Sequence, residues 1–241
     1  MFKDKVILIT GGSSGIGKAT ALMFAKNEAT VAIVYRENKT GADGVVNEIG
    51  RLGQKSIAIQ ANLINENEAK NVIEVTLKEF GKIDVLVNNA GKYIIGDEWG
   101  GTSEVWTRSL QSNLISMMNV SKYAVQLFQK QKNGNMVNVA SRHGIHGYPD
   151  AMAYSAAKAG VINITQIYAG LLAPFGRANS VSPWATKAGY WLTAPKEEVE
   201  ETILNAPGHK LVEPETIAER ILYLASDEAK DITGQNFAID R

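Results

Sequence analysis

Tyr154 and Lys158 are the two residues whose types and spacing point most directly to chemistry. They are four positions apart in a segment with helical spacing, so they would share one face of a helix. A phenol, with a pKa of about 10, transfers protons poorly at neutral pH unless a nearby positive charge stabilises its phenolate. The Lys158 ammonium could supply that charge. The same spacing is common in ordinary pairs on helix surfaces, so the pair alone leaves both interpretations open.

Ser141 adds a hydroxyl group that could lie beside this pair. It follows the apolar run 136–140, which predicts a strand, and precedes the helix expected over 151–172. The end of the strand and the start of the helix would therefore meet at the carboxyl edge of a sheet, where parallel α/β folds bind their ligands.

A glycine-rich turn, Thr-Gly-Gly-Ser-Ser-Gly-Ile-Gly at 10–17, links a strand expected over 6–9 to a helix expected over 15–26. Free N–H groups at the start of such a helix can bind a diphosphate. Turns favour glycine in any case, and the spacing differs from the general G-x-G-x-x-G pattern. The cofactor contacts that we expect here are Gly11, Ser13, Ser14, Gly15, Ile16 and Gly17.

Cofactor choice should be decided where the strand expected over 30–35 ends. An acidic residue there would bind the adenosine ribose hydroxyls of NAD, whereas an arginine accommodates the 2′-phosphate of NADP. Tyr35 occupies the acidic position and Arg36 follows it. The sequence therefore favours NADP(H), with NAD(H) as the alternative. Arg36 could also be an ordinary solvated residue after a strand.

Taken together, these motifs resemble the short-chain dehydrogenase/reductase family over nearly the whole chain. The pieces that carry the resemblance are Thr-Gly-x-x-x-Gly-Ile-Gly, Asn88-Asn89-Ala90-Gly91, Asn113, Ser141, Tyr154-x-x-x-Lys158 and 179–183. The resemblance implies that Tyr154 is the general acid or base and that Ser141 hydrogen-bonds the reacting oxygen. It further implies that Lys158 lowers the tyrosine pKa and binds the nicotinamide ribose. Asn113 would hold a water between Lys158 and solvent. The hydride would move between nicotinamide and substrate carbon, with no metal.

The resemblance also implies further cofactor contacts. Asn62 and Leu63 would lie near the adenine, although the family usually has Asp at the first of these positions. The contacts expected near the two ends of the nicotinamide riboside are Asn89, Ala90, Gly91, Pro183 and Thr186. Trp184 stands where the family usually has Gly, so the substrate-loop or lid region around 184–212 should be reshaped.

Strand-like and helix-like segments alternate along the chain, which requires crossover connections and a mainly parallel sheet. We therefore expect an α/β, doubly wound Rossmann-type sheet of about seven strands with helices on both faces, in a single domain over 1–241. The expected strands are 6–9, 30–35, 56–59, 83–87, 136–140, 178–181 and 236–239. The expected helices are 15–26, 42–52, 66–80, 102–131, 151–172 and 215–225.

Charge and composition exclude several other classes of protein. The 241 residues carry 25 basic and 25 acidic side chains, so no net charge attracts nucleic acid or an anionic membrane. No apolar run approaches the roughly 20 residues that span a bilayer. The chain has no cysteine, which fits a cytoplasmic location and excludes thiolate metal sites.

The predicted function is NADP(H)-dependent hydride transfer between nicotinamide and a carbonyl or secondary alcohol of a small ketone, sugar or related polar compound. The residues expected around the substrate mouth are Tyr93, Trp99, Arg142, His143, His146, Trp184, Tyr190 and Trp191. One alternative is a 3-oxoacyl-thioester (acyl-carrier-protein) reductase, with Lys130 and Lys132 meeting the acidic carrier. Another is a catalytically silent dinucleotide-binding regulator.

The helices expected over 102–131 and 151–172 carry apolar residues over more than one face. One face of such a helix packs on the sheet, and a second apolar face marks a subunit contact. We expect a homotetramer or homodimer, as the family resemblance also implies.

Overall fold

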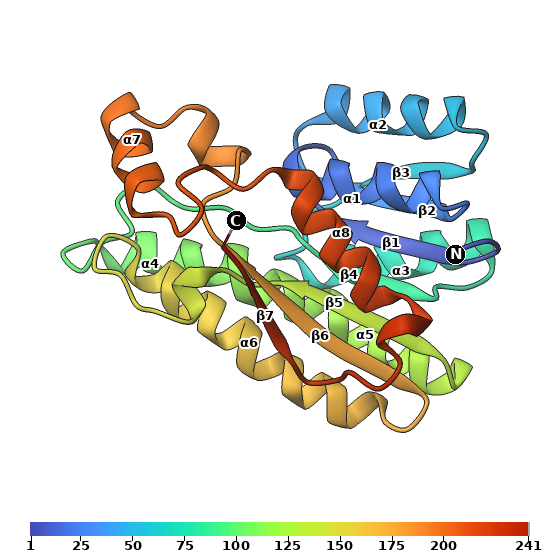
Figure 1. The fold of residues 1–241 in the computed structure, drawn as a ribbon. Helices are drawn as coiled ribbons and strands as arrows, with labels where there is room; N and C mark the ends of the chain where they lie inside the picture. The colour runs from blue at the N-terminus through green and yellow to red at the C-terminus, as the bar shows by residue number, and fades with distance from the viewer. Residues whose placement is uncertain (241) are drawn as a thin grey trace.

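Seven strands form one parallel sheet in the computed structural model, which describes residues 1–240 (Figure 1). Their order is β3-β2-β1-β4-β5-β6-β7, and the chain reverses direction across the sheet between β1 and β4. The strands are β1 (Val6–Thr10), β2 (Thr30–Tyr35), β3 (Ser56–Gln60), β4 (Val85–Asn88), β5 (Gly134–Val139), β6 (Gly176–Pro183) and β7 (Asn236–Ile239). The doubly wound fold expected from the sequence is confirmed.

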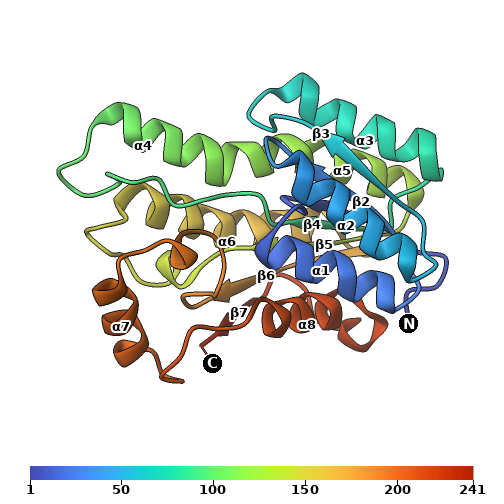
Figure 2. The ribbon, with the colours of Figure 1, turned by 90° about the horizontal axis from the view of Figure 1, so that it is seen from above.

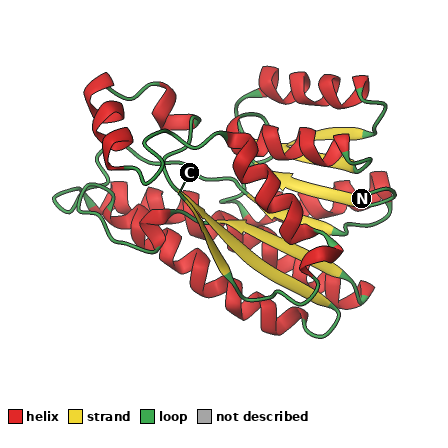
Figure 3. Ribbon diagram, viewed as in Figure 1, coloured by secondary structure: helices red, strands yellow, loops and turns green. Residues whose placement is uncertain are grey.

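Helices cover both faces of this sheet (Figures 2 and 3). Helices α1, α2 and α8 pack on one face and α3, α5 and α6 on the other, while α7 lies beyond the carboxyl ends of the strands (Figure 1). The helices are α1 (Gly15–Lys26), α2 (Lys39–Arg51), α3 (Glu66–Phe80), α4 (Ser103–Leu110), α5 (Ser116–Gln131), α6 (Met152–Leu172), α7 (Lys196–Asn205) and α8 (Pro214–Ala225). No helix within residues 1–240 combines the length and apolarity needed to cross a bilayer.

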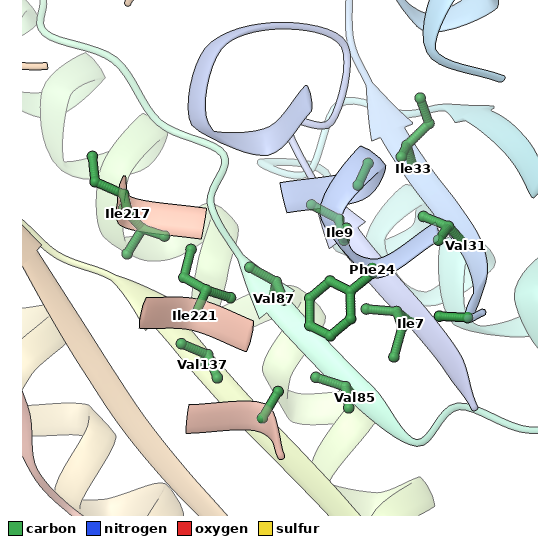
Figure 4. Close-up of a cluster of buried hydrophobic side chains, with 14 of the residues drawn as sticks. Ile7, Ile9, Phe24, Val31, Ile33, Val85, Val87, Val137, Ile217 and Ile221 are labelled. Atoms are coloured by element: carbon green, nitrogen blue, oxygen red, sulfur yellow. The ribbon is translucent and has the colours of Figure 1, made fainter. Parts of the chain in front are cut away.

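The strands are continuous apolar runs because both of their faces are covered. Ile7 and Ile9 of β1 face the same core cluster as Phe24 of α1 and Ile221 of α8 (Figure 4). Leu8, between them, faces the opposite cluster, which α3, α5 and α6 close. Burial on both faces leaves only the ends of the strands for polar ligands.

The prediction of one continuous helix over 102–131 is wrong, because a π-helical turn over Gln111–Ile115 divides this segment into α4 and α5. The Asn113 side chain donates to the Ser109 carbonyl at 3.0 Å and thus competes for a backbone acceptor. The Ser116 N–H bonds to the Gln111 carbonyl, which is the wider spacing of a π turn. This bulge turns Asn113 toward the loop that follows β4, where its amide also donates to the Lys92 carbonyl at 2.8 Å.

Helix α7 was not expected, because the sequence predicts only a substrate-loop or lid region around 184–212. This helix buries none of its residues, so it lacks the broad apolar face that predicts a helix from sequence. The other elements differ from their expected bounds by at most a few residues at their ends.

A buried polar ladder ties the strand ends near the site to the helices behind them. The Asn88 amide of β4 donates to Ser121 Oγ of α5 and to Asn138 Oδ1 of β5, both at 2.9 Å. The Asn138 amide in turn donates to Thr165 Oγ1 of α6 at 2.9 Å. Three buried hydrogen bonds in a row favour one arrangement of the elements that share them, although Asn88 Oδ1 has no partner within residues 1–240. The ladder therefore holds the carboxyl ends of β4 and β5 side by side.

Candidate active site

A cavity of about 950 Å³ opens at the carboxyl edge of the sheet, where the strand order reverses. It brings together nearly all of the residues that the sequence singled out. Those that line it are Gly11, Ser13, Ser14, Gly15, Ile16, Tyr35, Arg36, Asn62, Leu63, Asn89, Ala90, Gly91, Ser141, Tyr154, Lys158, Pro183 and Thr186. Gly17 and Asn113 lie behind its wall.

Gly17 shapes the diphosphate end without lining it. A Cβ atom at this position would lie 2.2 Å from the Gly11 carbonyl oxygen and 2.6 Å from Asn89 Nδ2. The absence of a side chain therefore lets the first turn of α1 sit directly against the glycine-rich turn. The N-terminus of α1 then points into the cavity, where its free N–H groups suit a diphosphate.

The end of the cavity near β2 carries one feature that the sequence did not reveal. Arg36 and Glu37 both line the cavity, and the Arg36 guanidinium pairs with the Glu37 carboxylate at 2.6 Å. Arg36 thus lines the cavity as expected, but its charge is partly neutralised by its neighbour. Tyr35 occupies the end of β2 without an acidic group, as the sequence indicated.

Ser141, Tyr154 and Lys158 meet at the other end of the cavity. Lys158 is buried, and its ammonium donates to the Val139 carbonyl at 2.9 Å. The same Nζ lies 5.6 Å from the centre of the Tyr154 ring. Ser141 Oγ accepts from the His143 backbone N–H at 3.2 Å, which fixes the hydroxyl oxygen at the end of β5.

Burial shifts the pKa values of this cluster in a consistent way. Desolvation lowers the pKa of Lys158 to about 8, since a charged ammonium is costly away from water. Desolvation also raises the pKa of Tyr154, while its hydrogen bond to Ser141 acts in the opposite direction. At neutral pH the phenol therefore holds its proton and the lysine is charged, which is the state required to donate a proton to a carbonyl oxygen.

Asp97 positions Tyr154, and nothing in its sequence context signalled this role. Its fully buried carboxylate accepts from the backbone N–H groups of Ala153 and Tyr154 at 2.7 and 2.8 Å. It therefore caps the N-terminus of α6 from a loop distant in sequence. Ser109 Oγ donates to the same carboxylate at 2.5 Å. This contact also connects α4 to the start of α6.

Asn113 approaches Lys158 through the space beside Gly91. A Cβ atom on Gly91 would lie 2.6 Å from Asn113 Oδ1 and 3.5 Å from Lys158 Nζ. Asn113 Oδ1 is buried and has no hydrogen-bond partner within residues 1–240. An orphaned acceptor beside a buried ammonium suits a bridging water, the role that the family resemblance implies for Asn113.

Most, but not all, of the residues predicted around the substrate mouth line the substrate end of the cavity. Tyr93, Arg142, His143, Trp184, Tyr190 and Trp191 line the cavity as expected, whereas Trp99 and His146 do not. The lining residues that were missed include Tyr148, Asp150, Glu198 and Glu201. The last two come from α7, so the missed helix accounts for part of the missed side chains.

Lys130 and Lys132 do not flank this mouth. They close α5 just before β5 begins at Gly134, at the amino edge of the sheet, and Lys132 lies over the Phe175 ring there. The prediction that these two lysines would meet an acidic carrier protein at the mouth is therefore wrong. Among the described residues no group of His, Cys, Asp and Glu side chains is arranged to hold a metal ion.

Comparison with known proteins agrees with this geometry. A family model described as enoyl-(acyl carrier protein) reductase matches residues 11–241. The 3-oxoacyl-(acyl-carrier-protein) reductase of Thermotoga maritima is 39% identical over 239 residues, covering 99% of this chain and 97% of the relative.

Two solved structures extend the likeness to proteins with bound nicotinamide cofactors. NAD⁺-bound xylitol dehydrogenase superposes with a TM-score of 0.93 at 26% identity, covering 99% of this chain and 98% of that one. A variant of actinorhodin polyketide ketoreductase with NADPH gives a TM-score of 0.91 at 26% identity, covering 99% and 97%. With the matching family model, the relative and the arrangement of Ser141, Tyr154 and Lys158, the chain belongs to the short-chain dehydrogenase/reductase family of NAD(P)-dependent oxidoreductases.

Proposed function

We propose that the protein uses NADP(H) to interconvert a carbonyl and a secondary alcohol on a compact polar substrate that is free in solution. The observation that carries this proposal is the meeting of Ser141, Tyr154 and a buried, charged Lys158 at one end of a cavity whose other end offers Arg36. NADP(H), when bound, exchanges a hydride with the substrate carbon.

The chain's own residues handle the proton. In the reducing direction Ser141 donates a hydrogen bond to the carbonyl oxygen and Tyr154 transfers its phenolic proton to that oxygen. Lys158 stabilises the phenolate that remains and, through the space beside Gly91, connects to Asn113 and a water. We further propose that the region around 184–212, which contains α7, covers the substrate as a lid.

Reduction of a 3-oxoacyl thioester is the second candidate, and the printed function of the Thermotoga maritima relative favours it. The charge of the lid opposes it for carrier-bound substrates. Helix α7 brings Glu198 and Glu201 to the mouth, and these side chains would repel an acidic carrier protein. A catalytically silent regulator is disfavoured by family membership and by the complete set of reacting residues.

The function is tested by following NADPH oxidation with a panel of small ketones, keto sugars and 3-oxoacyl thioesters, free and carrier-bound. We expect turnover of free compounds and a loss of roughly 10²–10⁴-fold in kcat for Tyr154→Phe, with NADPH binding retained, because the general acid is removed. Tyr168→Phe, on the same helix but outside the cavity, is the matched control. Near wild-type turnover by the Tyr154→Phe enzyme would show that Tyr154 is not the proton donor.

Cofactor preference gives a pair of opposite expectations. Arg36→Ala should weaken NADPH binding by about 1.5–3 kcal/mol, the range for a hydrogen bond to a charged group, and leave NADH binding nearly unchanged. Glu37→Gln should strengthen NADPH binding, because it removes the carboxylate that competes for Arg36. Fluorescence titration with NADPH and with NADH measures the affinity of each variant for the two cofactors. Equal losses of NADPH and NADH on Arg36→Ala would contradict recognition of the 2′-phosphate.

Lys158 should lower stability while it supports activity. Burial lowers its pKa to about 8 in the folded protein from the usual 10.5, so the folded state carries the full desolvation penalty below pH 8 and loses it as the pH rises toward 10.5. We expect Lys158→Met to be inactive yet more stable than wild type at pH 7 by about 1–3 kcal/mol. Urea unfolding at pH 7 and pH 10 should show this gain shrinking at the higher pH.

The control for this measurement is Lys70→Met on α3, whose lysine is half exposed, and which should alter stability little at either pH. A Lys158→Met protein less stable than wild type at pH 7 would contradict the assigned penalty.

We also propose that the protein is a cytoplasmic homotetramer built on α5 and α6. Most apolar side chains of these helices are buried in the core. Met118 of α5, Ile167 and Leu171 of α6, and Ile115 in the adjoining π turn remain between 37% and 55% exposed. Light scattering after size exclusion should give about four times the 26.1 kDa chain mass. Ile167→Lys and Leu171→Glu together should lower it. A monomeric mass for the wild-type protein would refute the assembly.

A further inference from the structure

The cavity carries an arc of aromatic rings beside the reacting phenol that the hydride and proton steps do not use. The Tyr93 ring lies 6.3 Å from the Tyr154 ring and 5.2 Å from Tyr190, whose ring lies 5.4 Å from Trp191, all edge to face. His143 continues the arc on the other side, with its ring 5.5 Å from Tyr154. All of these residues line the same cavity.

Three carboxylates line this end of the cavity as well, those of Asp150, Glu198 and Glu201. Glu198 is tied to the arc, because Tyr190 Oη donates to its Oε2 at 2.7 Å. Within residues 1–240 none of the three carboxylates forms an ion pair. Their negative charges are therefore left at the mouth with no basic partner.

The basic groups nearby offset this charge only in part. Arg142 pairs with Asp240 at 3.3 Å and lies over the Trp184 ring, and Lys158 belongs to the reacting cluster. Burial lowers the pKa of His143, against a smaller opposite effect of Asp150, which favours the neutral form of its ring. The remaining lining base on this side is Lys92, which is exposed.

The phenols of the arc respond to this negative field. The hydrogen bond to Glu198, followed by burial and the charge of Glu198, raises the pKa of Tyr190 to about 12. Burial raises the pKa of Tyr93, and the charges of Asp150 and Asp97 add to the shift. Nearby carboxylates thus add to both pKa shifts, beside the larger effects of burial for Tyr93 and of the Glu198 hydrogen bond for Tyr190.

We propose that the substrate carries a cationic ammonium group, which packs against the Tyr93 and Tyr190 rings with Glu198 as its counter-charge. Aromatic faces attract ammonium groups, the more so when a carboxylate stands beside them and water is partly excluded. Glu198 is then a specificity-determining residue that selects amino ketones or amino alcohols over neutral and anionic ones. This inference rests on the proposed carbonyl reductase function and specifies its substrate class.

A pair of isosteric ketones tests the proposal. Trimethylammonioacetone carries a permanent positive charge, and 4,4-dimethylpentan-2-one has the same shape without it. Their different intrinsic reactivities cancel when the ratio of their kcat/KM values is compared between enzymes. We expect Glu198→Gln to lower the ratio, cationic over neutral, by roughly tenfold, the factor for removing one unit charge several ångströms from a cation at a protein rim. Glu197→Gln, an exposed neighbour on α7 outside the cavity, should leave the ratio unchanged.

A binding measurement separates this inference from the function itself. Tetramethylammonium chloride, added to the NADP⁺-loaded protein at constant ionic strength, should quench tryptophan fluorescence at lower concentration in wild type than in Glu198→Gln. The inference would be overturned, while the function stands, if the neutral ketone is turned over and two comparisons show no difference. The first is the kcat/KM ratio of cationic to neutral ketone in wild type, Glu198→Gln and Glu197→Gln. The second is the tetramethylammonium titration of wild type and Glu198→Gln. Failure to turn over any ketone of the panel would overturn the function, and the titration would still decide whether the arc binds a cation.

Discussion

All seven strands run in the same direction, and this constraint determines where chemistry can occur. A parallel sheet must be covered on both faces, so its polar openings lie only at the strand ends. The carboxyl ends of β1, β4, β5 and β6 meet at one edge, with the glycine-rich turn, Gly91, Ser141 and Thr186 following them. The buried ladder through Asn88 and Asn138 keeps two of these ends in register.

Charge burial is the second constraint, and it acts through the first. Within residues 1–240, Lys158 is held in the interior by a hydrogen bond to the carbonyl of Val139, the last residue of β5. An ammonium in this position is unfavourable for folding but favourable for a developing phenolate, because the low local dielectric strengthens their attraction. The fold therefore places an energetically costly group beside the one phenol that benefits from it.

The two ends of the cavity differ in charge, and this difference suits the two molecules that must bind there. At one end Arg36 and the N–H groups of α1 favour phosphates, with Glu37 moderating the preference. At the other end Glu198 and the rings of Tyr93 and Tyr190 create a negative, aromatic surface. Glu198 of α7 supplies the charge of this second surface, so the proposed substrate preference depends on a helix that the sequence did not predict.

The sequence by itself determined the sheet, most of the helices that cover it and most of the residues that line the cofactor end of the cavity. These follow from short-range signals, namely apolar periodicity, the glycine turn over 10–17 and the Tyr154 to Lys158 spacing. Only the tertiary structure decided the π turn at Asn113, the capping of α6 by Asp97 and the carboxylates that α7 brings to the mouth. The capping of α6 joins residues 57 positions apart in sequence, and helix α7 buries too little apolar surface to leave a readable pattern. Long-range hydrogen bonds and charges carry no periodicity, so they appear only when the chain has folded.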